Sequence, residues 1–144
     1  MAAPGGFDMT HSAADRLDIL DLLASADNAA TRRDVTSYVA CFTEDAVLDG
    51  SMGEHRGKVA MEGAVGPIWQ AEGDSSVHLT TNAVVEPDSA ADDRAVAHSV
   101  LVILAKDPVT VHSVSNITQH LVKESTGWRV ARRTVQPLLG RTAC

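Results

Sequence analysis

The order of the secondary-structure signals is the feature that most constrains the fold of this chain. The first half is helix-periodic, whereas the second half holds four long runs rich in Val, Ile, Thr and Leu, a composition typical of strands. We predict the four strands at residues 77–86, 94–106, 109–124 and 128–137. Turn sequences at Asp107-Pro108 and Ser125 to Gly127 join neighbouring strands, so the sheet should be antiparallel and strongly curved. Helices followed by a meander of strands predict an α+β fold.

Three helices are predicted before this sheet. Ser12 and Asp15 have the spacing of a capping box, and the first helix should run from there to about Ala30. Its predicted buried face is made of Ala13, Leu17, Leu20, Leu23, Ala24 and Ala30. Asp34 can cap a second helix over residues 35–42, which would bury Tyr38, Val39 and Phe42. A short strand at 46–48, turns at Gly50, Gly53 and Gly57, and a third helix at 59–69 complete the first half.

Length and charge restrict the classes of protein that fit. The 144 residues, 44% of them apolar, suit one domain, which we place at residues 12–137 between tails at 1–11 and 138–144. The net charge of −7 argues against a nucleic-acid partner and against anionic membrane surfaces. No bilayer-spanning run or signal peptide is recognisable, which favours a cytoplasmic protein. Cys41 and Cys144 are not expected to form a disulfide.

Several sequence elements together resemble the SnoaL-like branch of the nuclear transport factor 2 (NTF2) superfamily. The elements are Asp18 to Leu23, Asp34, Phe42 to Asp49, Arg56-Gly57, His78 with Asn82, and Gly127 to Arg133. The resemblance covers residues 13–137 and implies a cystatin-like cone, in which three N-terminal helices pack on a strongly curved, mostly antiparallel sheet. Scytalone dehydratase, ketosteroid isomerase, a dehydrochlorinase and polyketide cyclases share this cone, as do non-enzymatic members, so the fold alone does not determine the reaction.

The resemblance also implies a role for His78. It matches the histidine that acts as general base in scytalone dehydratase and the dehydrochlorinase, a task suited to a side chain that titrates near neutral pH. In those relatives an aspartate orients the histidine, but the matching position here is Thr31. Asp27 lies one helical turn earlier on the predicted apolar face, and we hypothesise that it reaches His78 instead. The alternative is that the helix ends early and Asp27 is solvated.

Other positions bear on the type of reaction and on the residues that contact the ligand. Ala26 and Gly50 stand where ketosteroid isomerase has its two acids, which disfavours that mechanism. Ser113, Ser115, Ile117 and Gln119 should share one face of a strand. The resemblance to scytalone dehydratase implies that this is the pocket side. The predicted ligand contacts are Asn82, Ser115, Ile117, Trp69, Tyr38 and Thr31.

The remaining histidines show no metal-ligand spacing, so no metal is expected, and no cofactor is expected either. In the strands, we place His98 opposite the region of Ile117 and expect His98, His112 and His120 on the solvent or dimer face of the sheet.

These features favour a cofactor-independent enzyme that transfers protons on a hydrophobic or polycyclic molecule, by elimination, isomerisation or aldol-type cyclisation. A non-catalytic binding or structural member of the superfamily, or a small accessory subunit of an oxygenase, are the alternatives. We expect a homodimer formed through the exposed sheet face that carries Val100, Val102 and Val114.

Overall fold

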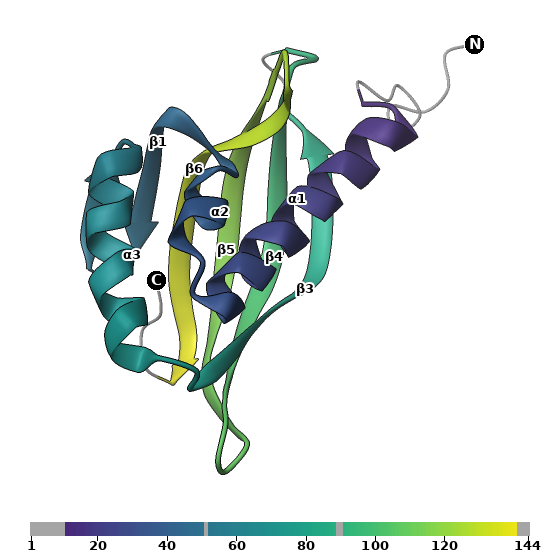
Figure 1. Cartoon of the computed structure of the whole chain (residues 1–144). Helices are drawn as coiled ribbons and strands as arrows, with labels where there is room; N and C mark the ends of the chain where they lie inside the picture. Colours follow the sequence, from purple (N-terminus) through teal and green to yellow (C-terminus); the bar gives the residue numbers. More distant parts are fainter. Residues whose placement is uncertain (1–10, 51, 89–90, 141–144) are drawn as a thin grey trace.

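A computed structural model describes residues 11–50, 52–88 and 91–140. Helices precede a six-stranded sheet, whose strands lie in the order β2-β1-β6-β5-β4-β3. The helices are α1 (Ala13–Arg32), α2 (Val35–Val39) and α3 (Lys58–Glu72). The strands are β1 (Phe42–Gly50), β2 (Gly53–Arg56), β3 (Ser76–Pro87), β4 (Arg94–Ala105), β5 (Thr110–Glu124) and β6 (Gly127–Gly140). All neighbouring strands are antiparallel except β1 and β6, and the helices cover one face of the curved sheet (Figure 1). The α+β cone predicted from the sequence is therefore confirmed.

Helix α1 begins and ends as predicted but buries a different face. The Ser12 hydroxyl accepts a hydrogen bond from the Asp15 backbone N–H at 3.0 Å, which caps the helix. The side chains that face the sheet are Ile19, Leu23, Ala26, Asp27, Ala29 and Ala30. Leu17 and Leu20 are exposed, so the predicted apolar face was wrong by part of a turn. Three alanines, at positions 26, 29 and 30, are buried on this face in place of the two leucines.

The segment between α1 and α3 differs from the prediction in where its elements end. Asp34 caps α2, but the helix stops at Val39, and Phe42 instead starts β1 by pairing with Val130 of β6. Residues 53–56, expected to be turns, form β2. Helix α3 continues through Pro67, which is exposed, so water can replace the backbone hydrogen bond that proline removes.

The long strands show the predicted alternation, interrupted by β-bulges. Near the β4–β5 turn the pairing is Leu104 with Val111, as expected, but beyond a bulge it shifts by one residue. His98 therefore faces Thr118, one residue from Ile117 and within the predicted region. Further bulges occur in the β3–β4 and β5–β6 pairs, and such insertions increase the twist and bend of a strand, which curves the sheet.

The ends of the domain extend further than expected. β6 continues to Gly140, so residues 138–140 belong to the sheet and not to a tail. At the other end, His11 is buried with its ring against Trp128, at a centroid distance of 5.5 Å. The remaining residues of both predicted tails, and Cys144, lie outside the described residues, while Cys41 is buried as a free thiol.

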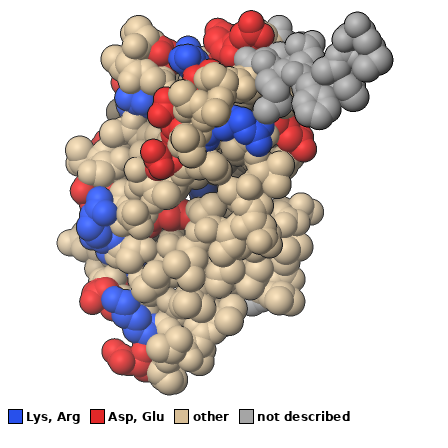
Figure 2. Space-filling view, turned by 90° about the vertical axis from the view of Figure 1, so that its right-hand side faces the viewer, with Lys and Arg blue, Asp and Glu red and all other residues tan. Residues whose placement is uncertain are grey.

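Two hydrophobic clusters fill the space between helices and sheet. The larger cluster joins the three helices to one end of the sheet, around residues such as Ile19, Phe42 and Trp128. The smaller cluster lies on the inner face of the sheet and consists of Leu101, Ile103, Ile117 and Val135. On the face formed by α1 and β3, charged side chains gather at the end where α1 begins and along one edge (Figure 2). Within the described part of the chain, no helix combines the length and apolar character needed to cross a bilayer.

Candidate active site

Helix α1 and strand β3 are joined by an antiparallel series of side-chain contacts that positions the candidate site. The Thr31 hydroxyl accepts a hydrogen bond from the His78 backbone N–H at 2.9 Å. One helical turn earlier, the Asp27 carboxylate accepts a hydrogen bond from the Thr80 hydroxyl. The spacing matches because four residues of helix rise about 6 Å and two residues of strand rise about 6.6 Å. Asp27 and Thr31 therefore lie over the inward-facing positions 80 and 78 of β3.

The His78 side chain is held uncharged at neutral pH. It is buried, at 7% exposure, and its pKa is lowered from 6.5 to about 4, mainly by burial and to a smaller extent by the charges of Arg33, Arg133 and His112. A neutral imidazole has one nitrogen lone pair available to accept a proton. His78 is thus in the protonation state that a general base requires, and its catalytic role stays a prediction.

Asp27 is buried, as predicted, but does not form the expected pair with His78. Its carboxylate is 4% exposed, and burial raises its pKa, an effect that the charge of Arg133 partly offsets. The structure pairs the carboxylate with Thr80, and no hydrogen bond or ion pair among the described residues joins it to His78. Asp27 does not contact His78 because Asp27 lies over Thr80 of β3, whereas Thr31 lies over His78. Asp27 and His78 still lie on the same inner surface, because Thr80, the partner of Asp27, is two residues from His78 along β3.

Polar side chains form a track along this inner surface. Those that are buried on strands β3 to β6 are Ser76, His78, Ser99, Ser113, Ser115, Gln119 and Arg133. Register places His78 and Ser113 in one row, each beside Ile103, while Gln119 pairs with Arg133 further along. The track therefore runs between the residues of the smaller hydrophobic cluster.

Four polar atoms on this track have no partner among the described residues. They are Ser113 Oγ, Ser115 Oγ, Gln119 Oε1 and Arg133 Nε. Each unsatisfied buried group costs about 1–3 kcal/mol, so native proteins satisfy such groups with water or a ligand. The set offers donors at Arg133 and both serines and an acceptor at Gln119, which suits a ligand carrying oxygen functions on an apolar frame.

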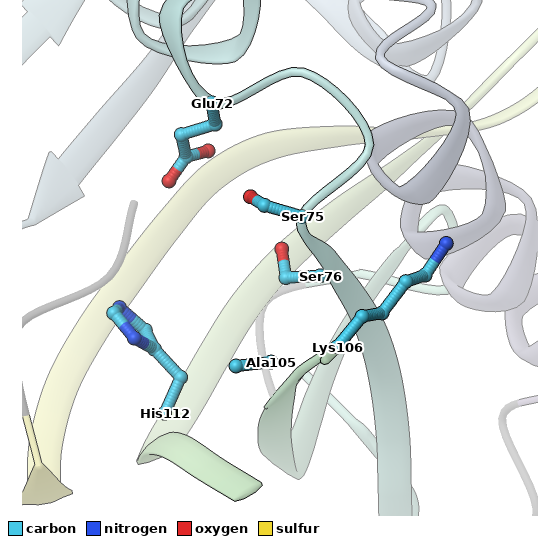
Figure 3. Close-up of a pocket in the computed structure, with 6 residues that line it drawn as sticks. All are labelled: Glu72, Ser75, Ser76, Ala105, Lys106 and His112. Carbon is cyan, nitrogen blue, oxygen red and sulfur yellow. The ribbon is translucent and has the colours of Figure 1, made fainter. Parts of the chain in front are cut away.

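A pocket opens at the end of this track where β3 begins. Its volume is about 240 Å³, and it is lined by Glu72, Ser75, Ser76, Ala105, Lys106 and His112. The Glu72 carboxylate, both serine hydroxyls and the His112 ring point toward one space, whereas the Lys106 ammonium points away (Figure 3) and pairs with Asp74. Ser76 lies two residues before His78 on the same strand face, so one lining residue of the pocket is the inward neighbour of His78 along β3.

Arg33 holds the rim of this pocket together. Its guanidinium donates hydrogen bonds to the Ala30 and Gly73 carbonyls and to the Ser76 hydroxyl, each at 2.8 Å, and lies 3.7 Å from Glu72. The arginine occupies a left-handed conformation with φ of 59°, a position after a helix where glycine is usual. An arginine at such a position indicates that its side-chain contacts to α1, α3 and β3 offset the backbone cost.

The other predicted ligand contacts occupy different environments. Ile117 and Ser115 face the interior as predicted. Trp69 and Tyr38 pack against each other in the larger cluster, with ring centroids 5.0 Å apart. Asn82 is exposed at the β3 bulge, with φ of 53°, so it lies apart from the polar track. Ligand contact by these residues stays a prediction.

Sequence reasoning missed three contributors to this site. His112 was expected on the solvent or dimer face, but a bulge places it at the pocket, which corrects that prediction. Arg33 and Arg133 were not recognised, because their positions depend on the helix end and on a strand bulge. No group of three or more His, Cys, Asp or Glu within the described ranges could hold a metal ion.

The buried imidazole predicts a pH-dependent stability. The folded-state pKa of His78 is below its unfolded value, so the unfolded state binds more protons and stability falls as pH falls from about 6.5 toward 4. At 1.36 kcal/mol per pKa unit, the full loss is about 3 kcal/mol. Urea unfolding at pH 7.5 and 4.5 should show a smaller loss in a His78→Gln variant than in the wild type. Parallel losses in the two proteins would contradict the burial of a neutral His78.

A curved sheet covered on one face by helices, with a polar track inside the cone, defines a cystatin-like, NTF2-like protein. The chain belongs to the SnoaL-like domain family, which matches residues 11–134. This superfamily includes enzymes such as scytalone dehydratase. No curated protein matches the chain significantly.

Solved structures support the fold. A protein of unknown function with a cystatin-like fold from Nostoc punctiforme is 22% identical, with a TM-score of 0.81 over 90% of this chain and 96% of its own. A protein of unknown function from Mycobacterium tuberculosis is 22% identical, with a TM-score of 0.78 over 88% and 78%. A protein from Novosphingobium aromaticivorans, provisionally described as a scytalone dehydratase, is 16% identical, with a TM-score of 0.74 over 90% and 87%. At these identities the likeness concerns the fold and not the reaction.

Proposed function

We propose that this protein is a cofactor-independent enzyme that moves protons on a hydrophobic carbonyl compound bound inside the cone. The observation that carries the proposal is the buried polar track, which holds a neutral imidazole and a guanidinium between apolar residues, together with the buried carboxylate of Asp27 on α1 beside it. Such groups are costly to bury, and clusters of buried groups with shifted pKa values occur preferentially at functional sites. The proposed roles follow from the chemistry of each group.

His78 removes a proton from the carbon next to the carbonyl, because it is neutral at physiological pH and lies on the same strand face as Ser76, which lines the pocket. Arg133 and the hydroxyls of Ser113 and Ser115 have unpaired donors that can stabilise the oxygen on which negative charge develops. Asp27 stays a proposed member of the site; through Thr80 it contacts the strand that carries His78. Enolisation of this kind is the step that elimination, isomerisation and aldol cyclisation share.

Deuterium exchange tests the proposal without knowledge of the natural substrate. A panel of bicyclic ketones is incubated with the protein in D₂O, and loss of the α-proton signal is followed by NMR. We expect at least one ketone to exchange in a saturable manner and faster than with free imidazole at equal concentration. Exchange no faster than with imidazole for every ketone would overturn the proposal. Protection of the protein against unfolding without exchange would instead support the binding-protein alternative.

A further inference from the structure

His112 occupies the extra position of a β-bulge. The side chains of Ser113 and Ser115 face the interior of the cone, so strict alternation would turn residue 112 outward. The β4–β5 register pairs Ile103 with Ser113 but Leu104 with Val111, which leaves His112 without an opposite residue. Bulges of this kind redirect a side chain and are frequent next to active sites. Here the bulge allows His112 to line the pocket.

The pocket brings His112 close to the proposed base. Ser113, the next residue, lies in the same cross-strand row as His78, so two strand spacings, about 10 Å, separate their backbones. The His112 ring points into the space that also receives the Glu72 carboxylate and the Ser76 hydroxyl (Figure 3). A ligand in this pocket therefore meets His112 and Ser76, and Ser76 is two residues from His78 on the same strand face.

We propose that His112 is a second catalytic residue, the general acid that protonates the ligand's carbonyl oxygen while His78 removes the α-proton. This proposal rests on the proposed function. In the step, the C–H bond breaks toward His78, its electrons form the C=C bond of the enol, and the carbonyl oxygen takes a proton from the His112 imidazolium. His78 gains one proton and His112 loses one. After the proton on His78 has exchanged with D₂O, His78 delivers a deuteron to the carbon while the enol oxygen returns its proton to His112, which restores the ketone and both histidines.

The surroundings of the two histidines suit this division of roles. His78 is buried and stays neutral, whereas His112 is exposed at the open pocket, where water can return its proton. Pairs of titratable groups in contrasting environments commonly divide acid and base roles.

Charged groups reach the pocket from each neighbouring element. Glu72 from α3 lines it, Arg33 at the end of α1 contacts Glu72, and Lys106 after β4 pairs with Asp74. Both cations thus already have carboxylate partners. Among the pocket-lining residues, His112 is the one whose side chain type exchanges protons near neutral pH.

The test compares His112→Gln with a matched variant of the same strand, His120→Gln. His120 is exposed on β5, pairs with Arg132 and is not among the pocket-lining residues. We expect His112→Gln to slow exchange about 100-fold and to remove the fall of the rate at alkaline pH. His120→Gln should retain the wild-type rate and pH profile. A rate for His112→Gln within about twofold of the wild type would overturn the proposal.

A second measurement is independent of any substrate. Because the charge of His112 lowers the pKa of His78, an NMR titration should show that pKa rising above about 4 in His112→Gln but not in His120→Gln. An unchanged His78 titration would show that the two rings do not share a site, which also overturns the proposal. If exchange survives in His112→Gln but is lost in His78→Gln, only this inference fails. If the wild-type protein shows no exchange, the proposed function fails with it.

Discussion

Replacing His78 with glutamine is expected to slow ketone exchange by about 100-fold or more, the usual contribution of a positioned general base. Glutamine has a similar size and can still hydrogen-bond, but it cannot accept a proton at neutral pH. The backbone N–H of residue 78 would keep its hydrogen bond to Thr31, so the strand should stay in place. The measurement is the saturated exchange rate by NMR at pH 7.5, together with the unfolding midpoint in urea.

The matched control for this variant is His98→Gln. His98 lies on the outer face of the sheet, half exposed and 3.6 Å from Glu86, so it cannot contact a ligand inside the cone. Its replacement should leave the exchange rate unchanged. Exchange at the wild-type rate in a folded His78→Gln variant would exclude His78 as the base and would leave Asp27 as the candidate.

The second large effect concerns the stability of the buried charges. Arg133 is 4% exposed, and its charge favours the ionised form of Asp27. In Arg133→Met the carboxylate would lose this neighbour, and an uncompensated buried charge typically costs about 3–5 kcal/mol. Because burial raises the pKa of Asp27, the variant should be least stable at alkaline pH, where the carboxylate is ionised, and should recover as the pH falls and the group protonates.

A double variant separates the charge effect from lost packing. Asp27→Asn combined with Arg133→Met removes both charges, and asparagine can still accept the hydrogen bond of Thr80. We expect the double variant to be more stable than Arg133→Met alone, with a coupling of about 1–3 kcal/mol in urea unfolding. Arg132→Met is the control, because Arg132 joins Asp49 and Glu54 in an ion cluster that water reaches, and solvent screening makes such a cluster contribute little to stability. Additive effects of the two buried substitutions would show that Asp27 and Arg133 do not interact.

Local signals in the sequence predicted the elements that depend on neighbouring residues. Ser12 and Asp34 cap helices because a side-chain oxygen reaches a backbone N–H three residues ahead, a contact independent of the rest of the fold. The inward alternation of Ser113, Ser115, Ile117 and Gln119 was also predicted correctly, since it needs only an unbroken strand.

Long-range contacts decided what the sequence could not predict. Phe42 starts a strand because it pairs with Val130, far along the chain, although its local sequence resembles a helix end. The buried face of α1 was misjudged because the alanines, and not Leu17 and Leu20, meet β3. These outcomes depend on which surfaces meet, and the helical period of the sequence contains no information about that.

Some features of the candidate site follow from local sequence signals, whereas others depend on tertiary contacts. The sequence by itself determined an α+β order of elements and the strand faces of His78 and of the β5 serines, because strand alternation specifies the face of each side chain. The cone was implied by the resemblance to the SnoaL-like family, and the burial of Asp27 was left open. Only the tertiary structure decided that Asp27 contacts Thr80, that Arg133 lies near it, and that a bulge brings His112 to the pocket beside His78. Bulges and helix-to-strand spacing arise when elements pack and curve together, so they are set by the whole fold and not by any one segment.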